Sequence, residues 1–292
     1  MMRSTVLRWY LLTVCCALVM EAVCVTSPAE TAAKAGGGKF FVFDNGVGRG
    51  KWTPQEQASV LKELGFDGIS YNYTNNEELE KRIEAFKAVN LKIFGLYCGA
   101  KLDKPQQYDP KLKEAFKILK GSDTVIWWTV TGGKYGLEDD NAVKSVQEIA
   151  GIAAENGLQV VLYPHKGCYI ATASDSARIA RKVGCANVSA SFNLCHEFLT
   201  DRGDKVPETL KEVAPHLKLV SINGVDVKNK KYILRLDQGD YDIAGFLGML
   251  SDVGYKGPIG LQCYSIPGDQ RENLKENISA WRKIQEKIAS GK

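Results

Sequence analysis

The chain after residue 39 alternates short apolar runs with segments of helical period, and this alternation constrains its fold more than any other feature. The apolar runs lie at residues 40–46, 66–71, 92–98, 124–130, 159–165, 187–194, 218–224 and 258–264. Several are rich in Val, Ile, Phe or Trp, and they lack the clean polar alternation of a half-exposed sheet. This pattern is typical of parallel strands that are covered on both faces.

The segments between these runs carry helix start and stop signals. Thr53 is a cap residue before Pro54, a first-position proline, and Gly65 closes the same segment. Residues 141–156 repeat apolar side chains at helical spacing. We expect further helices at residues 204–214, 242–253 and 269–289.

Strict alternation of strand and helix predicts parallel pairing through right-handed crossovers. Eight repeats close a ring, so we predict a single (β/α)8 barrel over residues 40–292, close to the typical length of about 250 residues. The alternative is an open, doubly wound sheet. The glycines at residues 45–50 lack the full GxGxxG spacing of its nucleotide-binding turn.

The first 39 residues are expected to lie outside the barrel. Arg3 and Arg8 precede an apolar run at residues 9–20, and small and polar residues follow. This run is too short to span a bilayer, which needs about 20 apolar residues. We predict a signal peptide at residues 1–27 and a flexible linker at residues 28–39. The protein is then exported, periplasmic or extracellular, with no membrane attachment once the leader is removed.

The composition excludes a disordered or fibrous chain, and the charge pattern gives no sign of a nucleic-acid partner. A chain with 45% hydrophobic and 25% charged residues is ordinary for a globular domain. Lys and Arg alternate with acids along the helical segments, so the net charge of +4 predicts no patch for nucleic acid. Five cysteines follow the leader without metal-type CxxC spacing. The four near the predicted catalytic rim are expected to pack as small apolar residues, with a thiolate ligand or a disulfide as the alternatives: Cys98, Cys168, Cys195 and Cys263.

Polar residues gather where the strands run into the following loops, which is where (β/α)8 barrels carry their chemistry. Of the three histidines, His165 and His196 end strands five and six, whereas His216 precedes strand seven at the opposite rim. Imidazole titrates near neutrality and can transfer a proton or bind a metal. We therefore predict that His165 and His196 are the catalytic residues.

Seven more side chains at these strand ends are predicted to bind the substrate: Asp44, Asn45, Tyr97, Asn193, Asn223, Gln262 and Tyr264. Gln262 lies between apolar neighbours, which favours an inward contact. Asn45 and Asn223 adjoin glycines, and an equal alternative for both is a structural role in satisfying loop backbone groups. Trp127 and Trp128 are predicted to be core residues rather than a stacking platform for a sugar.

The sequence resembles the xylose isomerase-like barrel superfamily of sugar phosphate isomerases and epimerases, in an exported bacterial branch. The stretches that carry the resemblance are residues 43–46, 64–69, 162–165, 192–196, 220–224 and 257–264. It extends from Phe40 to about Trp281. The resemblance implies a (β/α)8 barrel with a small sugar-like ligand. The related apurinic endonuclease branch needs several metals and many acidic ligands, so DNA repair is not expected.

Active members of that superfamily usually hold a divalent cation with carboxylates and histidines on strands five to eight. The strand-five carboxylate falls at about Tyr163, and the strand-seven histidine falls near Ser221. Asn193 and Gln262 stand where the family has acids, and only His196 matches directly. Because Mg²⁺ and Mn²⁺ need anionic oxygen ligands, the resemblance leaves at most a weak divalent-metal site. Its ligands would be His165, Asn193, His196 and Gln262.

Three functions remain open at this point. The first is an isomerase or epimerase that shifts a proton on a small sugar or polyol derivative with His165 and His196 as acid/base groups. The second is a non-catalytic carbohydrate-binding barrel that has lost its metal and its turnover. The third is an enzyme whose metal site is rebuilt from His, Asn and Gln.

Overall fold

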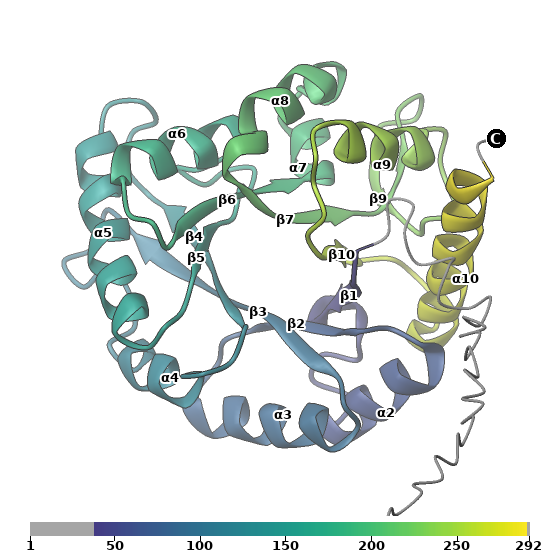
Figure 1. Ribbon diagram of the computed structural model, residues 1–292, viewed down its shortest axis with the longest axis horizontal. Coiled ribbons are helices and arrows are strands. Elements are labelled where there is room, and N and C mark those ends of the chain that lie inside the picture. Colours follow the sequence, from purple (N-terminus) through teal and green to yellow (C-terminus); the bar gives the residue numbers. More distant parts are fainter. Residues whose placement is uncertain (1–37, 291–292) are drawn as a thin grey trace, which may run out of the picture. The chain divides into compact units, whose positions relative to one another are not determined.

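The computed structural model describes residues 38–290, which form a closed barrel of eight parallel strands inside a ring of helices (Figure 1). The strand order around the ring is β1-β10-β7-β6-β5-β4-β3-β2, and β1 (Phe40–Phe43) closes it against β10 (Ile259–Leu261). The predicted (β/α)8 barrel is confirmed. The predicted signal peptide and most of the predicted linker lie outside the described residues.

Each predicted apolar run overlaps one barrel strand. The other strands are β2 (Gly68–Asn72), β3 (Lys92–Lys101), β4 (Val125–Thr131), β5 (Val160–Leu162), β6 (Val188–Asn193) and β7 (Leu217–Ile222). Most of their residues are buried, because helices cover the outer face of the ring and side chains fill its interior.

Helices follow the strands as predicted. They are α2 (Pro54–Leu64), α3 (Asn76–Ala88), α4 (Leu112–Ile118), α5 (Asp139–Glu155), α6 (Ala173–Val183), α8 (Val206–Val213), α9 (Ile243–Asp252) and α10 (Gln270–Ala289). The predicted signals around α2 are confirmed. The Thr53 side chain accepts from the Glu56 backbone N–H, and Gly65 ends the helix at φ 88°, in the left-handed region.

Aromatic side chains fill the inside of the barrel. Phe41 stacks on Phe94 with ring centroids 4.7 Å apart, and Trp127 meets Tyr163 edge-on at 4.8 Å. Trp128 points to the other side of β4 and packs between strands and helices, because successive strand residues face opposite ways. Both tryptophans are fully buried core residues, as predicted. The interior is therefore a packed core, and a ligand site must lie at one of its ends.

Two local elements differ from the simple repeat. Helix α7 (Leu194–Leu199) begins directly after β6, so that His196 lies on a helix rather than in a loop. Between β7 and α9, strands β8 (Gly224–Asp226) and β9 (Lys231–Leu234) form an antiparallel hairpin. Neither element was predicted, because each is too short to carry a hydrophobic period of its own.

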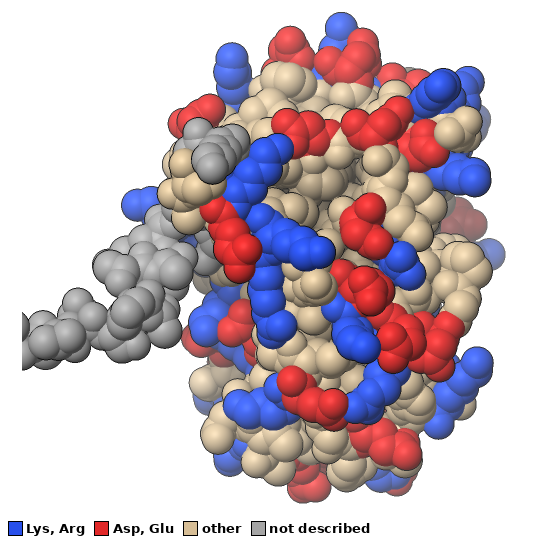
Figure 2. Space-filling view, turned by 90° about the vertical axis from the view of Figure 1, so that its right-hand side faces the viewer, with Lys and Arg blue, Asp and Glu red and all other residues tan. Residues whose placement is uncertain are grey.

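The face that carries α10 has a mixed charged surface. Figure 2 shows Lys and Arg interspersed with Asp and Glu on this face. This agrees with the alternating charges along the helical segments of the sequence. None of the helices within residues 38–290 is long and apolar enough to cross a membrane.

Candidate active site

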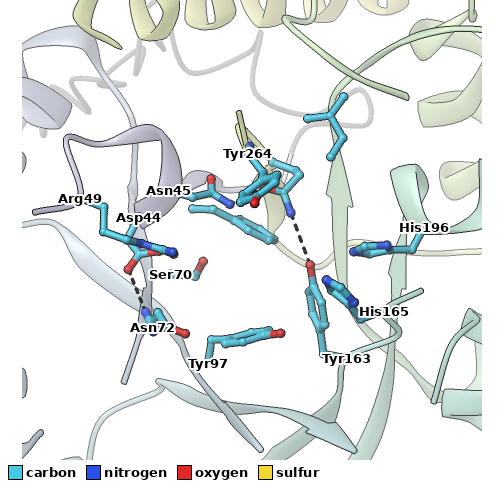
Figure 3. A pocket seen from close by; sticks show the side chains of 13 residues that line it. Asp44, Asn45, Arg49, Ser70, Asn72, Tyr97, Tyr163, His165, His196 and Tyr264 are labelled. Carbon is cyan, nitrogen blue, oxygen red and sulfur yellow. Dashed lines mark hydrogen bonds and ion pairs between the residues drawn. The ribbon is translucent and has the colours of Figure 1, made fainter. Parts of the chain in front are cut away.

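A cavity of about 340 Å³ lies at the C-terminal ends of the barrel strands. It is lined by Phe43, Asp44, Asn45, Arg49, Ser70, Asn72, Tyr97, Tyr163, His165, His196, Ile233, Gln262 and Tyr264. Figure 3 shows Asp44 and Arg49 on one side of the cavity and the two histidines on the other. The volume is in the range of small-molecule sites.

The two predicted catalytic histidines lie side by side, with ring centroids 4.1 Å apart. The backbone of Lys166 contacts both rings. Its carbonyl accepts a hydrogen bond from His165 Nδ1 at 2.8 Å, and its N–H donates to His196 Nδ1 at 3.3 Å. A carbonyl can only accept and an N–H can only donate, so the neutral rings take opposite tautomers. His165 then has a free lone pair on Nε2, whereas His196 carries a proton on Nε2.

Burial keeps both imidazoles neutral. Desolvation, followed by the charges of His165 and Lys166, lowers the pKa of His196 to about 3. Desolvation also lowers the pKa of His165 from its usual 6.5, and the hydrogen bond to Lys166 opposes this in part. At neutral pH the pair therefore combines a base, His165 Nε2, with a hydrogen-bond donor, His196 Nε2–H.

A buried network of amides surrounds the hydroxyl of Tyr163. Asn193 Nδ2 donates to this oxygen, and Gln262 Nε2 donates to it at 3.5 Å. The other end of the Gln262 amide is also engaged, because Oε1 accepts from Asn45 Nδ2 at 2.5 Å and from the Tyr264 N–H at 3.1 Å. Polar groups from β6, from η2 (Asp44–Gly46) and from the residues that directly follow β5 and β10 thus meet in one connected set.

Among residues 38–290, the only charged side chains that line the cavity, Asp44 and Arg49, are on the opposite wall. Arg49 Nη2 pairs with Asp44 Oδ1, and Asp44 Oδ2 accepts from the Asn72 backbone N–H at 3.1 Å. The Asp44 side chain is buried, whereas that of Arg49 is 50% exposed. The carboxylate therefore holds the guanidinium at the cavity, where its remaining N–H groups can donate to ligand oxygens.

Glu197, next to the histidine pair, does not line the cavity. Its Oε1 accepts from the Ala173 N–H at the start of α6 at 2.7 Å, and Arg202 Nε lies 3.5 Å from its Oε2. Desolvation raises the pKa of this carboxyl, while the contacts with Ala173 and Arg202 oppose the rise. Glu197 thus joins α6 to the helix that carries His196.

The structure brings most of the predicted substrate-binding residues to one place. Those that line the cavity are Asp44, Asn45, Tyr97, Gln262 and Tyr264. Asn193 lies behind the cavity wall, against Tyr163. Asn223 lies outside the wall, and its Nδ2 donates to the carbonyls of Gly224 at 2.7 Å and Tyr232 at 2.6 Å. Asn223 therefore stabilises the β8–β9 hairpin, which is the structural alternative considered for it.

Four polar residues of the cavity were not predicted to be site residues: Arg49, Ser70, Asn72 and Tyr163. Ser70 and Asn72 lie on β2, and the strand-end rule applied to that strand would have found Asn72. Arg49 follows β1 within the glycine-containing segment. The family resemblance places a carboxylate at about Tyr163, which was a signal that a polar group belongs there.

The side chains present do not fit the divalent cation that the family resemblance implies. Asn193 Oδ1 accepts from the Cys195 thiol at 3.1 Å, and Gln262 Oε1 accepts from two protein donors. Both histidine Nδ1 atoms are engaged by the Lys166 backbone, so each ring has only Nε2 free. Within residues 38–290 no group of three or more His, Cys, Asp or Glu side chains could hold a metal. A hard dication would find no anionic ligand next to the two imidazoles.

Comparisons with solved structures show the same fold at low sequence identity. An L-ribulose 3-epimerase aligns with a TM-score of 0.70 and 11% identity over 87% of this chain and 97% of its own. The 3-keto-D-glucoside 4-epimerase of E. coli aligns with a TM-score of 0.66 and 15% identity over 85% and 99%.

The chain covers only 43% of a third similar structure, a xylose isomerase-like TIM barrel/4-hydroxyphenylpyruvate dioxygenase fusion protein. There the TM-score is 0.66 and the identity 15%, over 86% of this chain. No curated protein matches the sequence significantly.

A family model described as xylose isomerase-like TIM barrel matches residues 58–284, which is most of the barrel. The match includes both histidines and Gln262, and the closed parallel barrel agrees with it. The chain therefore belongs to the xylose isomerase-like TIM barrel family.

Proposed function

We propose that this protein is an isomerase or epimerase that shifts a proton next to the carbonyl group of a small sugar or polyol derivative, without a metal ion. The observation that carries the proposal is the pair of neutral imidazoles with opposite tautomers, His165 and His196, in the cavity wall. The similar epimerase structures support the class of reaction.

The proton removal and the stabilisation of the resulting oxyanion each have a group to perform them. His165 Nε2 takes the proton from the carbon next to the carbonyl, and the C–H electron pair forms a carbon–carbon double bond. The carbonyl oxygen becomes an oxyanion, to which His196 Nε2–H donates a hydrogen bond. For isomerisation, His165 returns its proton to the neighbouring carbon, while the hydroxyl of the deprotonated carbon passes its proton to the oxyanion and becomes the new carbonyl. For epimerisation, a water molecule delivers a proton to the opposite face of the deprotonated carbon, and His165 releases its proton to solvent.

The cavity wall supports a polyhydroxyl ligand. Asp44 and Arg49 offer acceptors and donors opposite the histidines, and the Tyr97 and Tyr264 rings offer apolar surface. Tyr264 is 60% exposed in this structure, so a ligand can cover it. Mixed hydrogen-bonding groups and aromatic surface are what a sugar, with hydroxyl edges and C–H faces, can contact.

The test is incorporation of solvent deuterium into a panel of small ketoses and aldoses, followed by NMR. We expect incorporation that EDTA does not reduce and that His165→Gln abolishes. The matched control is His216→Gln, which changes the third histidine at the opposite rim. Thermal stabilisation by a sugar without any exchange would instead favour the non-catalytic binding barrel. Loss of activity with EDTA and its return with a transition metal would overturn the metal-free mechanism.

A further inference from the structure

The amide groups around Tyr163 have a fixed direction, because backbone N–H groups determine which end of each amide points where. The Cys263 N–H donates to Asn45 Oδ1 at 3.3 Å, which turns the Asn45 NH₂ toward Gln262 Oε1. The Tyr264 N–H donates to the same Gln262 oxygen. The Gln262 NH₂ must therefore face the Tyr163 oxygen.

Asn193 reaches the same oxygen from the other side. Its Oδ1 accepts from the Cys195 thiol, so its NH₂ is directed at Tyr163. A phenol oxygen has two lone pairs and one proton. The two amides occupy the lone pairs, and only the proton remains to form a hydrogen bond. No acceptor for that proton is found within residues 38–290.

The hydroxyl is also well placed and remains protonated. Tyr163 lines the cavity, and its ring centroid lies 6.1 Å from that of His165 and 6.0 Å from that of His196 (Figure 3). Desolvation, followed by the nearby Cys195 and Tyr97, raises the pKa of this phenol well above 10. An unused buried donor is costly in free energy unless something accepts from it.

We propose that Tyr163 is a catalytic residue whose hydroxyl donates a hydrogen bond to the substrate oxygen on which negative charge develops. Its O–H dipole stabilises the developing charge electrostatically. The inference rests on the proposed function for the identity of the reaction. It adds a second donor to His196, so that two groups with fixed protons meet one oxyanion.

No proton leaves Tyr163 in this step. When His165 removes the proton from carbon, the carbonyl π electrons move onto oxygen, and the Tyr163 hydrogen bond shortens as the charge grows. When the proton returns to carbon, the carbonyl is restored and the hydrogen bond weakens again. Because the bond is stronger in the transition state than with bound substrate, its loss acts on kcat more than on KM.

Tyr163→Phe removes only the hydroxyl, and its matched control is Tyr255→Phe. Tyr255 is a partly buried tyrosine at the opposite end of the barrel, where its hydroxyl donates to the Pro258 carbonyl at 2.6 Å. In the deuterium-incorporation assay we expect Tyr163→Phe to lower kcat by about 10²–10³-fold. KM should change little, and Tyr255→Phe should keep the wild-type rate. If Tyr163→Phe keeps the wild-type kcat while His165→Gln is inactive, the reaction stands and the role of Tyr163 is overturned.

A binding measurement tests the inference even if no sugar is turned over. A small polyol hydroxamate mimics the planar, anionic intermediate of a proton shift, and calorimetry gives its Kd. We expect the affinity of Tyr163→Phe for the hydroxamate to be lower by about tenfold or more, which corresponds to about 1.4 kcal/mol. The affinity of Tyr255→Phe should equal that of the wild type. Equal affinity of wild type and Tyr163→Phe, or no binding to the wild type, overturns the inference.

Discussion

Both ends of the barrel are hollowed, but the two hollows differ in chemistry. The cavity at the N-terminal ends of the strands has a volume of about 390 Å³, against about 340 Å³ for the candidate active site. Its wall includes four lysines: Lys39, Lys92, Lys218 and Lys256. The wall of the candidate active site instead consists mainly of neutral polar and aromatic groups around one ion pair.

The difference shows that volume does not identify a site. The N-terminal lysines are in solvent and partly paired: Lys39 is 71% exposed and contacts Asp67 at 2.8 Å, and Lys92 contacts Asp123 at 2.7 Å. Groups of this kind are already satisfied by water and by each other. At the C-terminal end, burial removes water from Tyr163 and His196, and the protein uses all but one hydrogen-bonding position of each. Those unused positions are what a ligand can recognise.

The largest difference between the two ends should appear in catalysis. Replacing His165 by Gln removes the proposed base, and we expect the rate of proton exchange to fall by about 10²–10⁴-fold. Lys218→Met, at the other end, should leave the rate unchanged. The deuterium-incorporation assay measures both, and an equal loss in the two variants would break the distinction between the ends.

The second difference is in the pH dependence of stability. His196 has a folded pKa of about 3 against 6.5 for the unfolded chain, so between these values the unfolded state binds more protons. The contribution of His196 to the free energy of unfolding is greatest above pH 6.5. It should fall as the pH drops toward 3, by about 1.4 kcal/mol per pH unit. Urea unfolding between pH 7 and 4 measures the slope. We expect a shallower slope for His196→Gln than for wild type, and parallel curves would contradict the assignment.

A third comparison sets Glu197, a buried carboxylate at the C-terminal end of the barrel, against Asp123, an exposed carboxylate at the N-terminal end. Glu197→Ala leaves the Ala173 N–H without its partner and Arg202 without its carboxylate, and we expect a loss of about 1–3 kcal/mol in the free energy of unfolding. Chemical denaturation measures this loss. A change close to zero would mean that the carboxylate does not hold α6 to α7.

The smallest effect is expected for Asp123→Ala at the N-terminal end. Its partner Lys92 is 42% exposed and Asp123 itself is 86% exposed, so solvent screens the pair. We expect a loss of about 0–1 kcal/mol, measured by the same denaturation. A loss as large as that for Glu197→Ala would show that solvent does not screen the Lys92–Asp123 pair and that the N-terminal lysines are held in place by the protein.

Much of the fold could be predicted because its causes are local. The runs that became β1 to β7 and β10 are apolar on both faces, and helix α2 carries its start and stop signals in its own residues. The strand-end rule also placed His165 and His196 at one rim. It did not predict the β8–β9 hairpin, or that Asn223 would stabilise it, because no periodic pattern marks so short an element.

By itself, the sequence determined the barrel and the rim at which His165 and His196 lie. The tertiary structure alone decided which histidine nitrogen keeps its lone pair and which way each amide points. Asn45 and Gln262 are 217 residues apart, yet they exchange a hydrogen bond whose direction depends on backbone N–H groups beside them. Protons and lone pairs are assigned by such partners, and partners that meet only in the folded chain leave no trace in a local pattern.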